Sequence, residues 1–126
     1  IKIRQLSPLV RRGADKMRHE VSQDPQRFRA EVLALNNDNT PHVNALSAQA
    51  LDALIAQAAS FRVMTNQDKA LSGFVLLLRE GQAYESLNYR WFSETFETFL
   101  YVDRIIVAPH CRGAGVAQAL YDHATA

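Results

Sequence analysis

The stretch VAPHCRGAGVAQAL, residues 107–120, is the part of this chain best suited to bind an anion. Gly113 and Gly115 stand one residue apart, directly after Arg112 and before a helix-like apolar segment. The first N–H groups of a helix have no intrahelical partner, and the helix dipole adds partial positive charge there. Glycines let a diphosphate approach the backbone, and arginine can add a charge-assisted contact. The spacing predicts a diphosphate-binding loop, with a tight turn that needs positive φ as the simpler alternative.

Two common phosphate-binding motifs do not fit this loop. A GxGxxG pattern that starts at Gly113 would require glycine at the position of Gln118, and the Gly-Lys-Ser/Thr ending of a Walker A motif is absent. Pro109 has no backbone N–H to donate and predicts the end of the preceding strand. The loop therefore joins a strand to a helix through a different glycine pattern.

The elements around the loop predict one mixed α/β (α+β) domain over residues 1–126. A strand over residues 99–107 leads into the loop, and a helix with an apolar face follows it. Further upstream we expect strands over 1–7, 61–65 and 71–79, the last buried on both faces. Three helices are expected before residue 61. The first has Val10, Ala14, Met17 and Val21 on one face. The second begins after the N-cap Asp24-Pro25, and the third begins at the N-cap Ser47. Residues 80–98 are expected to form a long connection.

Composition limits the class of protein. The chain has 126 residues, 48% hydrophobic and 21% charged, with a formal net charge of +1. Such a composition is globular and gives no strong field, so we expect no nucleic-acid partner. No apolar run approaches the length of a membrane span, and no signal peptide is evident. The single cysteine, Cys111, excludes an internal disulfide and predicts a reducing, cytoplasmic setting.

The segment IIVAPHCRGAGVA, residues 105–117, resembles motif A of the GNAT superfamily of N-acetyltransferases. That motif is a strand ending in Val-Xaa-Pro, followed by Arg-Gly-Xaa-Gly-Xaa-Gly/Ala at the start of a helix. The order of the predicted elements also resembles the family, and the segments 33–37, 88–92 and 101–105 look like a group of predicted bacterial members. The resemblance covers most of the chain; residues 8–24 are its least typical part.

The resemblance implies acetyl-CoA as co-substrate and direct transfer of the acetyl group to a primary amine, small-molecule or protein, in a ternary complex. It implies that the loop backbone holds the pyrophosphate and that the strand lies along the pantetheine arm. The cofactor-binding residues implied in this way are Ile105, Ile106, Val107, Arg112, Gly113, Ala114, Gly115, Val116 and Ala117. A backbone N–H of Ile105 or Val107 would serve the acetyl carbonyl. No metal is expected.

Asp103 and Tyr101 are the candidate catalytic side chains. Some family members carry a glutamate base where this sequence has Tyr101, so that base does not carry over. Strand alternation predicts that residues 101, 103, 105 and 107 share one face, which would let Asp103 relay a proton from the amine through water. The alternatives are a structural Asp103 paired with Arg104 or a loop arginine, and a Tyr101 that only packs.

Four residues are candidates for acceptor binding by resemblance: Asn36, Asn37, Tyr89 and Trp91. The alternative for the aromatic residues is packing onto the sheet. Cys111 is expected to be structural, and the histidines show no metal-ligand spacing.

Relatives continue beyond the motif A helix with another strand, a helix and a hairpin. The sequence therefore indicates a domain that is incomplete at its C-terminus, with an exposed strand edge. We expect residues 1–126 alone to be inactive and either to associate through that edge, for example as a homodimer, or to aggregate. An N-acetyltransferase is the favoured function. The competing function is a non-catalytic GNAT-like module for CoA binding or interaction.

Overall fold

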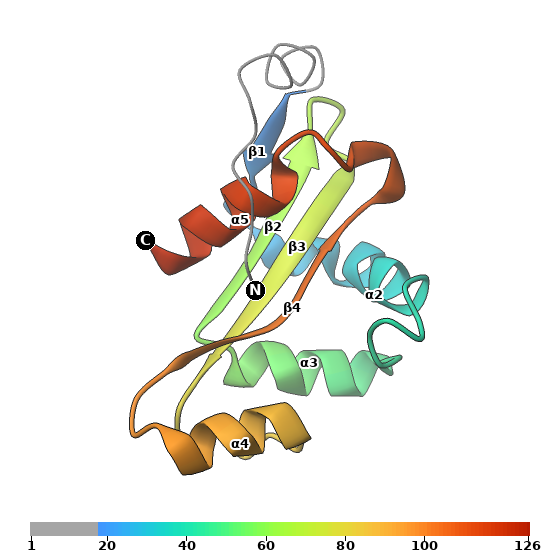
Figure 1. Cartoon of the computed structure of the whole chain (residues 1–126). Helices are drawn as coiled ribbons and strands as arrows, with labels where there is room; N and C mark the ends of the chain where they lie inside the picture. The colour runs from blue at the N-terminus through green and yellow to red at the C-terminus, as the bar shows by residue number, and fades with distance from the viewer. Residues whose placement is uncertain (1–17) are drawn as a thin grey trace.

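The computed structural model of the chain describes residues 18–126. A four-stranded antiparallel sheet forms its centre, with the strand order β1-β2-β3-β4 (Figure 1). The strand expected over residues 1–7 and most of the helix expected around residues 10–21 lie outside the described residues. The exception is Val21, which the sequence placed on a helix face and which instead ends β1, His19–Val21. That prediction was wrong because β1 pairs with β2, where Val21 lies opposite Met64.

The three remaining strands lie close to the ranges predicted from the sequence, 61–65, 71–79 and 99–107. β2 spans Ser60–Asn66, β3 spans Leu71–Arg79 and β4 spans Leu100–Val107. Seven consecutive residues of β3 are buried, as its apolar run predicts for a central strand covered on both faces. β4 forms one edge of the sheet, with no strand beyond it among residues 18–126.

The helices before β2 begin and end close to their predicted positions. A 3-10 turn, η1 (Pro25–Phe28), leads into α2 (Arg29–Asn37), and α3 spans Ala48–Gln57. Ser47 caps α3 by accepting a hydrogen bond from the backbone N–H of Ala50 at 3.0 Å. Asp24 precedes η1 as predicted, but its side chain makes no capping hydrogen bond.

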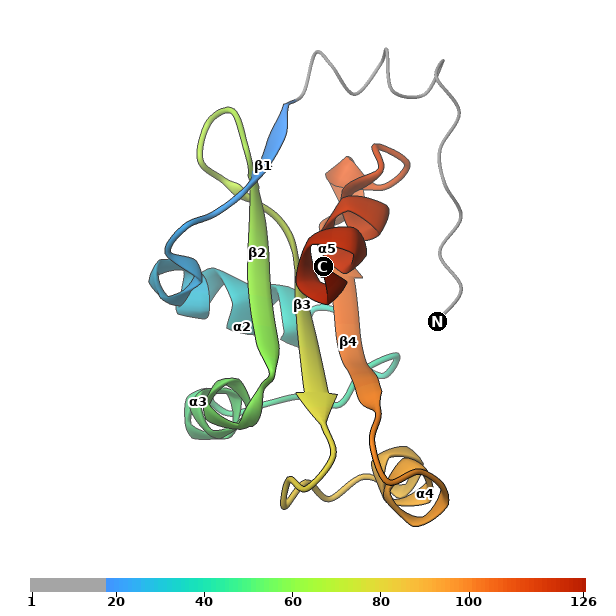
Figure 2. The same ribbon diagram turned by 90° about the vertical axis from the view of Figure 1, so that its left-hand side faces the viewer.

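The segment expected to be a long connection contains a helix, α4 (Leu87–Thr95). Ser86 caps it by accepting from the backbone N–H of Tyr89, and the aromatic residues Tyr89, Phe92 and Phe96 recur at the spacing of one helix face. The prediction of a long connection without a helix was therefore wrong, although both signals for a helix are present in the sequence. Figure 2 shows α4 beyond the end of the sheet where β4 begins.

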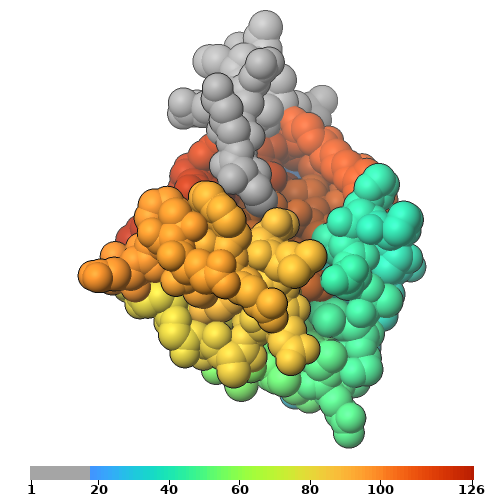
Figure 3. Space-filling view, turned by 60° about the horizontal axis from the view of Figure 1, so that its bottom comes forward, coloured from blue at the N-terminus to red at the C-terminus, as the bar shows by residue number. Residues whose placement is uncertain are grey.

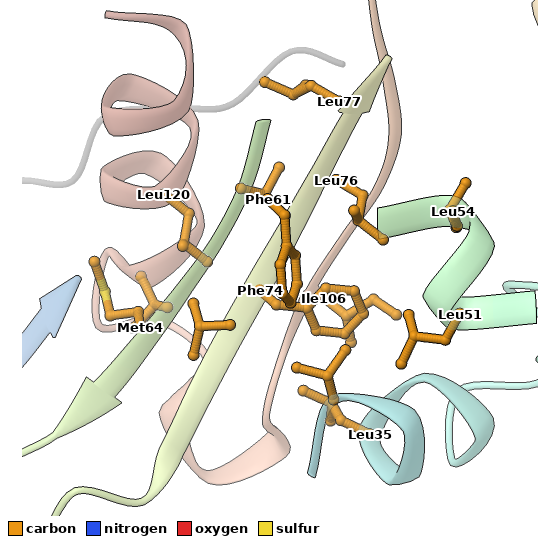
Figure 4. Packing of buried hydrophobic residues seen from close by; sticks show 14 of the residues in the cluster. Leu35, Leu51, Leu54, Phe61, Met64, Phe74, Leu76, Leu77, Ile106 and Leu120 are labelled. Atoms are coloured by element: carbon orange, nitrogen blue, oxygen red, sulfur yellow. The ribbon is translucent and has the colours of Figure 1, made fainter. Parts of the chain in front are cut away.

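After β4, a 3-10 turn, η2 (Pro109–Cys111), leads through the glycine loop into α5 (Val116–Thr125). Figure 4 shows α5 on one side of β2 and β3, and α2 with α3 on the other. The layers pack closely: a Cβ built on Gly73 of β3 would lie 3.2 Å from Val116 and 3.3 Å from Leu120 of α5. The order and packing of the elements therefore match the mixed α/β fold predicted from the sequence.

A β-bulge in β4 changes which residues share a face. Leu76 of β3 lies opposite Arg104 and Leu77 lies opposite Val102, so Asp103 is an extra residue on β4. Beyond the bulge, Ile105 lies opposite Val75 on the α5 side.

The predicted common face for residues 101, 103, 105 and 107 is therefore wrong. Tyr101 lies on the side covered by α2 and α3, whereas Ile105 and Val107 lie on the α5 side.

Candidate functional site

The glycine loop has the backbone conformation that its sequence requires. Gly113 has φ +85° and Gly115 has φ +80°, in the left-handed region that favours glycine. A Cβ built on Gly113 would meet no atom within 4 Å, so the space beside this residue is open. The structure thus combines a tight turn with room for a ligand against the backbone.

Several N–H groups of this loop have no backbone hydrogen-bond partner among residues 18–126. The N–H of Ala114 bonds to the carbonyl of Cys111 at 3.3 Å, and that of Ala119 bonds to Gly115 at 3.0 Å. Between and beside these bonds, five donors lack a backbone partner, as expected for the first turn of α5. They belong to Gly113, Gly115, Val116, Ala117 and Gln118. These donors cluster at the N-terminus of a helix, where the dipole favours an anion.

Arg112 joins the glycine loop to the rest of the molecule. Its Nε donates to the carbonyl of Val107 at 3.3 Å, and its Nη2 donates to Oδ1 of Asn39, after α2, at 3.2 Å. The side chain lies at the surface, so its charge is accessible to a ligand on the loop.

The free edge of β4 presents further backbone donors. The N–H of Ala108 bonds to the carbonyl of Ser72 in β3 at 2.8 Å. Because inward- and outward-pointing groups alternate along an antiparallel strand, the N–H groups of Ile105 and Val107 point away from β3. The two amides predicted to serve an acyl carbonyl are therefore directed toward the open edge.

The bulge of β4 carries a buried polar network. Asp103 and Arg104, whose side chains are 5% and 6% exposed, are joined by a bond of 2.7 Å from Arg104 Nε to Asp103 Oδ2. The hydroxyl of Tyr84 donates to Asp103 Oδ1 at 2.5 Å. Arg104 Nη1 donates to Asn36 Oδ1 at 2.7 Å and to the carbonyl of Asn44 at 3.4 Å. The network links β4 to the α2–α3 loop and to the segment before α4.

Burial and this network fix the protonation of Tyr84. Desolvation, followed by the hydrogen bond to Asp103 and its negative charge, raises the pKa of Tyr84 to about 12, and Arg104 opposes this only in part. Tyr84 is therefore a hydrogen-bond donor to Asp103 throughout the physiological range. The carboxylate of Asp103 has two of its roughly four acceptor positions filled in this way.

A hollow of about 540 Å³ lies beside the network. Figure 3 shows the segment that precedes and begins α4, in gold, facing the α2–α3 loop, in teal, across this hollow. Tyr101, Asp103 and Arg104 of β4 line it, together with residues 42–44 and 84–88. The two candidate catalytic residues thus share a hollow even though strand alternation is broken at the bulge.

The four candidate acceptor-binding residues lie in different surroundings. Asn36 is fully buried in the network, and Asn37 fastens the α2–α3 loop by bonding to both backbone groups of Leu46. Tyr89 is 2% exposed, and its hydroxyl donates to the carbonyl of Arg79 at 2.5 Å. Trp91 is 55% exposed on α4. These contacts give Asn36, Asn37 and Tyr89 structural partners; a contact with an acceptor stays a prediction for all four.

Cys111 and His19 lie outside the hollow and make structural contacts. Cys111 is 1% exposed within the core, in keeping with a structural thiol. His19 Nδ1 lies 2.7 Å from Oγ of Ser72, and burial together with the nearby His110 lowers its pKa. Among residues 18–126, no group of three or more His, Cys, Asp or Glu side chains is placed to hold a metal ion. In the same range, none of the helices is long and apolar enough to cross a membrane.

Comparison with known proteins identifies the family. A family model described as the acetyltransferase (GNAT) family matches residues 18–126. The chain belongs to the GNAT acetyltransferase family. Members of this family are acetyltransferases, and the family generally uses acetyl-CoA. A search of curated proteins finds no match.

Two solved structures share this GNAT fold. One contains a glucosamine N-acetyltransferase region of a fungal multi-domain β-N-acetylglucosaminidase, with a TM-score of 0.61 and 15% identity over 86% of this chain. This chain spans only 12% of that protein. The other is an acetyltransferase of Trypanosoma brucei, with a TM-score of 0.53 and 19% identity over 86% of this chain and 72% of that one. At these identities the likeness shows the fold alone.

Sequence reasoning missed two parts of this site. Tyr84 was one of several aromatic residues in a segment expected to be irregular, and nothing local in the sequence marks its bond to a residue of β4. Arg104 was considered only as a partner of Asp103, although it also bonds to Asn36, 68 positions away in the chain. The hydrogen bonds of Tyr84 and Arg104 depend on the bulge at Asp103, and no local feature of the sequence predicts that bulge.

Proposed function

We propose that this GNAT protein is an acetyl-CoA-dependent N-acetyltransferase that transfers the acetyl group directly to a primary amine in a ternary complex. The observation that carries the proposal is the arrangement along β4 and its loop. Loop amides without a backbone partner among residues 18–126 lie at one end of β4. The outward-pointing amides of the strand follow, and a polar hollow lies at the bulge. In this order, the loop would hold the diphosphate end of the co-substrate, the strand would hold its arm, and the hollow would hold the second substrate next to the acetyl group.

The residues of the glycine loop fit the diphosphate of acetyl-CoA. Five N–H donors without a backbone partner among residues 18–126 converge at the start of α5, and the space beside Gly113 is open. Arg112 adds a positive charge at the same place. Bound there, acetyl-CoA supplies an activated acetyl thioester; Ile105, Ile106 and Val107 are proposed to line its arm.

Two groups of β4 are proposed to assist the transfer. The outward N–H of Ile105 or Val107 donates to the carbonyl oxygen that gains negative charge as the amine attacks. Asp103, with acceptor positions still unfilled beside the hollow, takes the proton of the amine through water. Tyr101 lines the same hollow and shapes it.

An amine as acceptor is also supported by the fungal structure, which contains a glucosamine N-acetyltransferase region. The buried single cysteine suits a reducing compartment, and we propose that the protein acts in the cytoplasm.

A non-catalytic CoA-binding module is the second candidate, and the engagement of Asp103 by Arg104 and Tyr84 favours it. Thiol release from acetyl-CoA, measured together with mass spectrometry of an added amine, separates the two. Amine-dependent thiol release with an equal amount of N-acetylated product supports the enzyme. Tight CoA binding with no product across a panel of primary amines supports the module.

A further inference from the structure

The hollow beside the β4 bulge has an uneven charge distribution. Asp103 and Arg104 neutralise each other through their bond of 2.7 Å. Glu85, in the segment before α4, also lines the hollow, lies exposed, and forms no ion pair with any of residues 18–126. Within residues 18–126, Glu85 therefore adds one negative charge without an ion-pair partner to the lining of the hollow.

Part of the remaining lining supplies hydrogen-bonding groups. Side chains of His42, Asn44, Ser86 and Asn88 border the hollow from its two facing segments. Ser86 has already accepted the N–H of Tyr89 at 3.3 Å, but its hydroxyl proton is still available as a donor. Hydroxyl or amide groups of a ligand would find both donors and acceptors here.

Among residues 18–126, Arg104 is the one guanidinium in the lining, and it is already paired. The side chain of Arg104 is 6% exposed, and its guanidinium is bonded to Asp103 and to Asn36. A ligand carboxylate would instead face Glu85, and like charges repel. This arrangement disfavours zwitterionic amino acids.

We infer that this hollow receives the acceptor, and that the acceptor is a primary ammonium compound with neutral hydroxyl or amide groups and no carboxylate. Glu85 is the specificity-determining residue: it attracts the ammonium group at the mouth and repels acceptors that bear a carboxylate. A hollow of about 540 Å³ has the size of a small-molecule site. The inference rests on the proposed function, because it takes the hollow as the acceptor side of that reaction.

Three small amines test the inference. 2-Amino-1,3-propanediol, serine and 2-aminobutane share a primary amine on a short chain. The diol carries two hydroxymethyl groups, serine carries one hydroxymethyl group and a carboxylate, and 2-aminobutane carries only alkyl groups. Each is titrated into the ¹⁵N-labelled full chain saturated with CoA, and binding is followed by amide chemical shifts. We expect the diol to bind most tightly and to shift the amides of residues 42–44 and 84–88. Tighter binding of serine or 2-aminobutane, or shifts confined to other residues, would overturn the inference.

Glu85→Gln and the matched control Glu94→Gln give the decisive comparison. Glu94 is an exposed carboxylate of α4 outside the lining, so both variants lose one negative charge from the same region. Glu85→Gln should weaken binding of the diol about two- to fivefold, the range for an exposed ion pair, and should strengthen binding of serine. Glu94→Gln should change neither. Equal effects of the two variants, or changes of the same sign for both ligands, contradict a role for Glu85.

Binding and turnover are read separately in this design. Binding of the diol in the hollow without any acetylated product supports the inference about the ligand and refutes the proposed enzymatic function. Acetylation of an amine that leaves residues 42–44 and 84–88 unshifted supports the function and refutes the inference.

Discussion

Replacing Asp103 with asparagine should strongly destabilise the fold, because it leaves a buried guanidinium without its counter-ion. The side chains of Asp103 and Arg104 are 5% and 6% exposed, so water cannot replace the lost charge. Asparagine keeps the shape and can still accept one hydrogen bond, either from Arg104 Nε or from the hydroxyl of Tyr84.

The size of the effect follows from the burial of the pair. Removing one partner of a buried ion pair lowers the free energy of unfolding by about 3–5 kcal/mol. Because asparagine retains one hydrogen bond, we expect Asp103→Asn to lower it by about 3 kcal/mol. For a domain of this size, that loss lowers Tm by about 10–15 °C. Because Arg104 also bonds to Asn36, the damage should extend to the α2–α3 loop.

Urea and thermal unfolding of Asp103→Asn, Arg104→Met and the double variant measure this cycle. The double variant should be more stable than the sum of the two losses predicts, by about 1 kcal/mol or more, because it leaves no orphaned charge. A single variant within about 0.5 kcal/mol of the parent, or additive losses, would refute the reasoning.

The pH–rate profile tests the catalytic role of Asp103 separately. If Asp103 takes the proton of the amine, turnover in Asp103→Asn should recover at high pH, where free amine accumulates; an unchanged profile leaves Asp103 purely structural.

Three smaller changes test other parts of the structure. Gly73→Ala should cost about 1–3 kcal/mol in urea unfolding, since its Cβ would lie 2.7 Å from a backbone oxygen of β4 and overpack α5; stability equal to the parent would contradict the close packing. His19 has a lowered pKa from burial and from nearby His110, so its contribution to stability is complete above about pH 6.5 and is lost as the pH falls below that value. In His19→Asn, the free energy of unfolding should therefore fall less steeply as the pH drops below about 6.5 than in the parent. An unchanged slope would count against this role of His19. In Tyr84→Phe, the tyrosinate absorbance should lose a component that titrates at about pH 12 in the parent, as the bond to Asp103 predicts; loss of a component near pH 10 would show that this bond is absent.

Local signals in the sequence predicted most of the fold. The uninterrupted apolar run of β3 and the capping serine before α3 placed those elements correctly, because burial and capping act through neighbouring residues. The structure shows the positive φ at Gly113 and Gly115 that the simpler alternative, a tight turn, required; diphosphate binding by this loop stays a prediction. Only β2 and β3 are joined by a short turn; the order of the other elements was indicated by the resemblance to the GNAT family.

What the sequence did not predict depends on distant contacts. The bulge at Asp103 exists only in the register between β3 and β4, and it reversed the faces assigned to Ile105 and Val107. Helix α4 was missed although Ser86 and the aromatic spacing indicate it, because the segment was interpreted by its aromatic content instead. The polar network around Arg104 joins three segments and has no local signature.

Binding of CoA to a matched pair of glycine variants tests the central claim most directly. Gly113 and Gly81 both have φ +85°, and a Cβ on either would meet no atom within 4 Å. Alanine at either position should therefore cost a similar amount of stability, about 1–2 kcal/mol of left-handed strain. Calorimetric titration should show CoA binding severely weakened in Gly113→Ala and unchanged in Gly81→Ala, because only Gly113 lies in the proposed diphosphate loop. Equal CoA affinity in the two variants would contradict the loop as the co-substrate site.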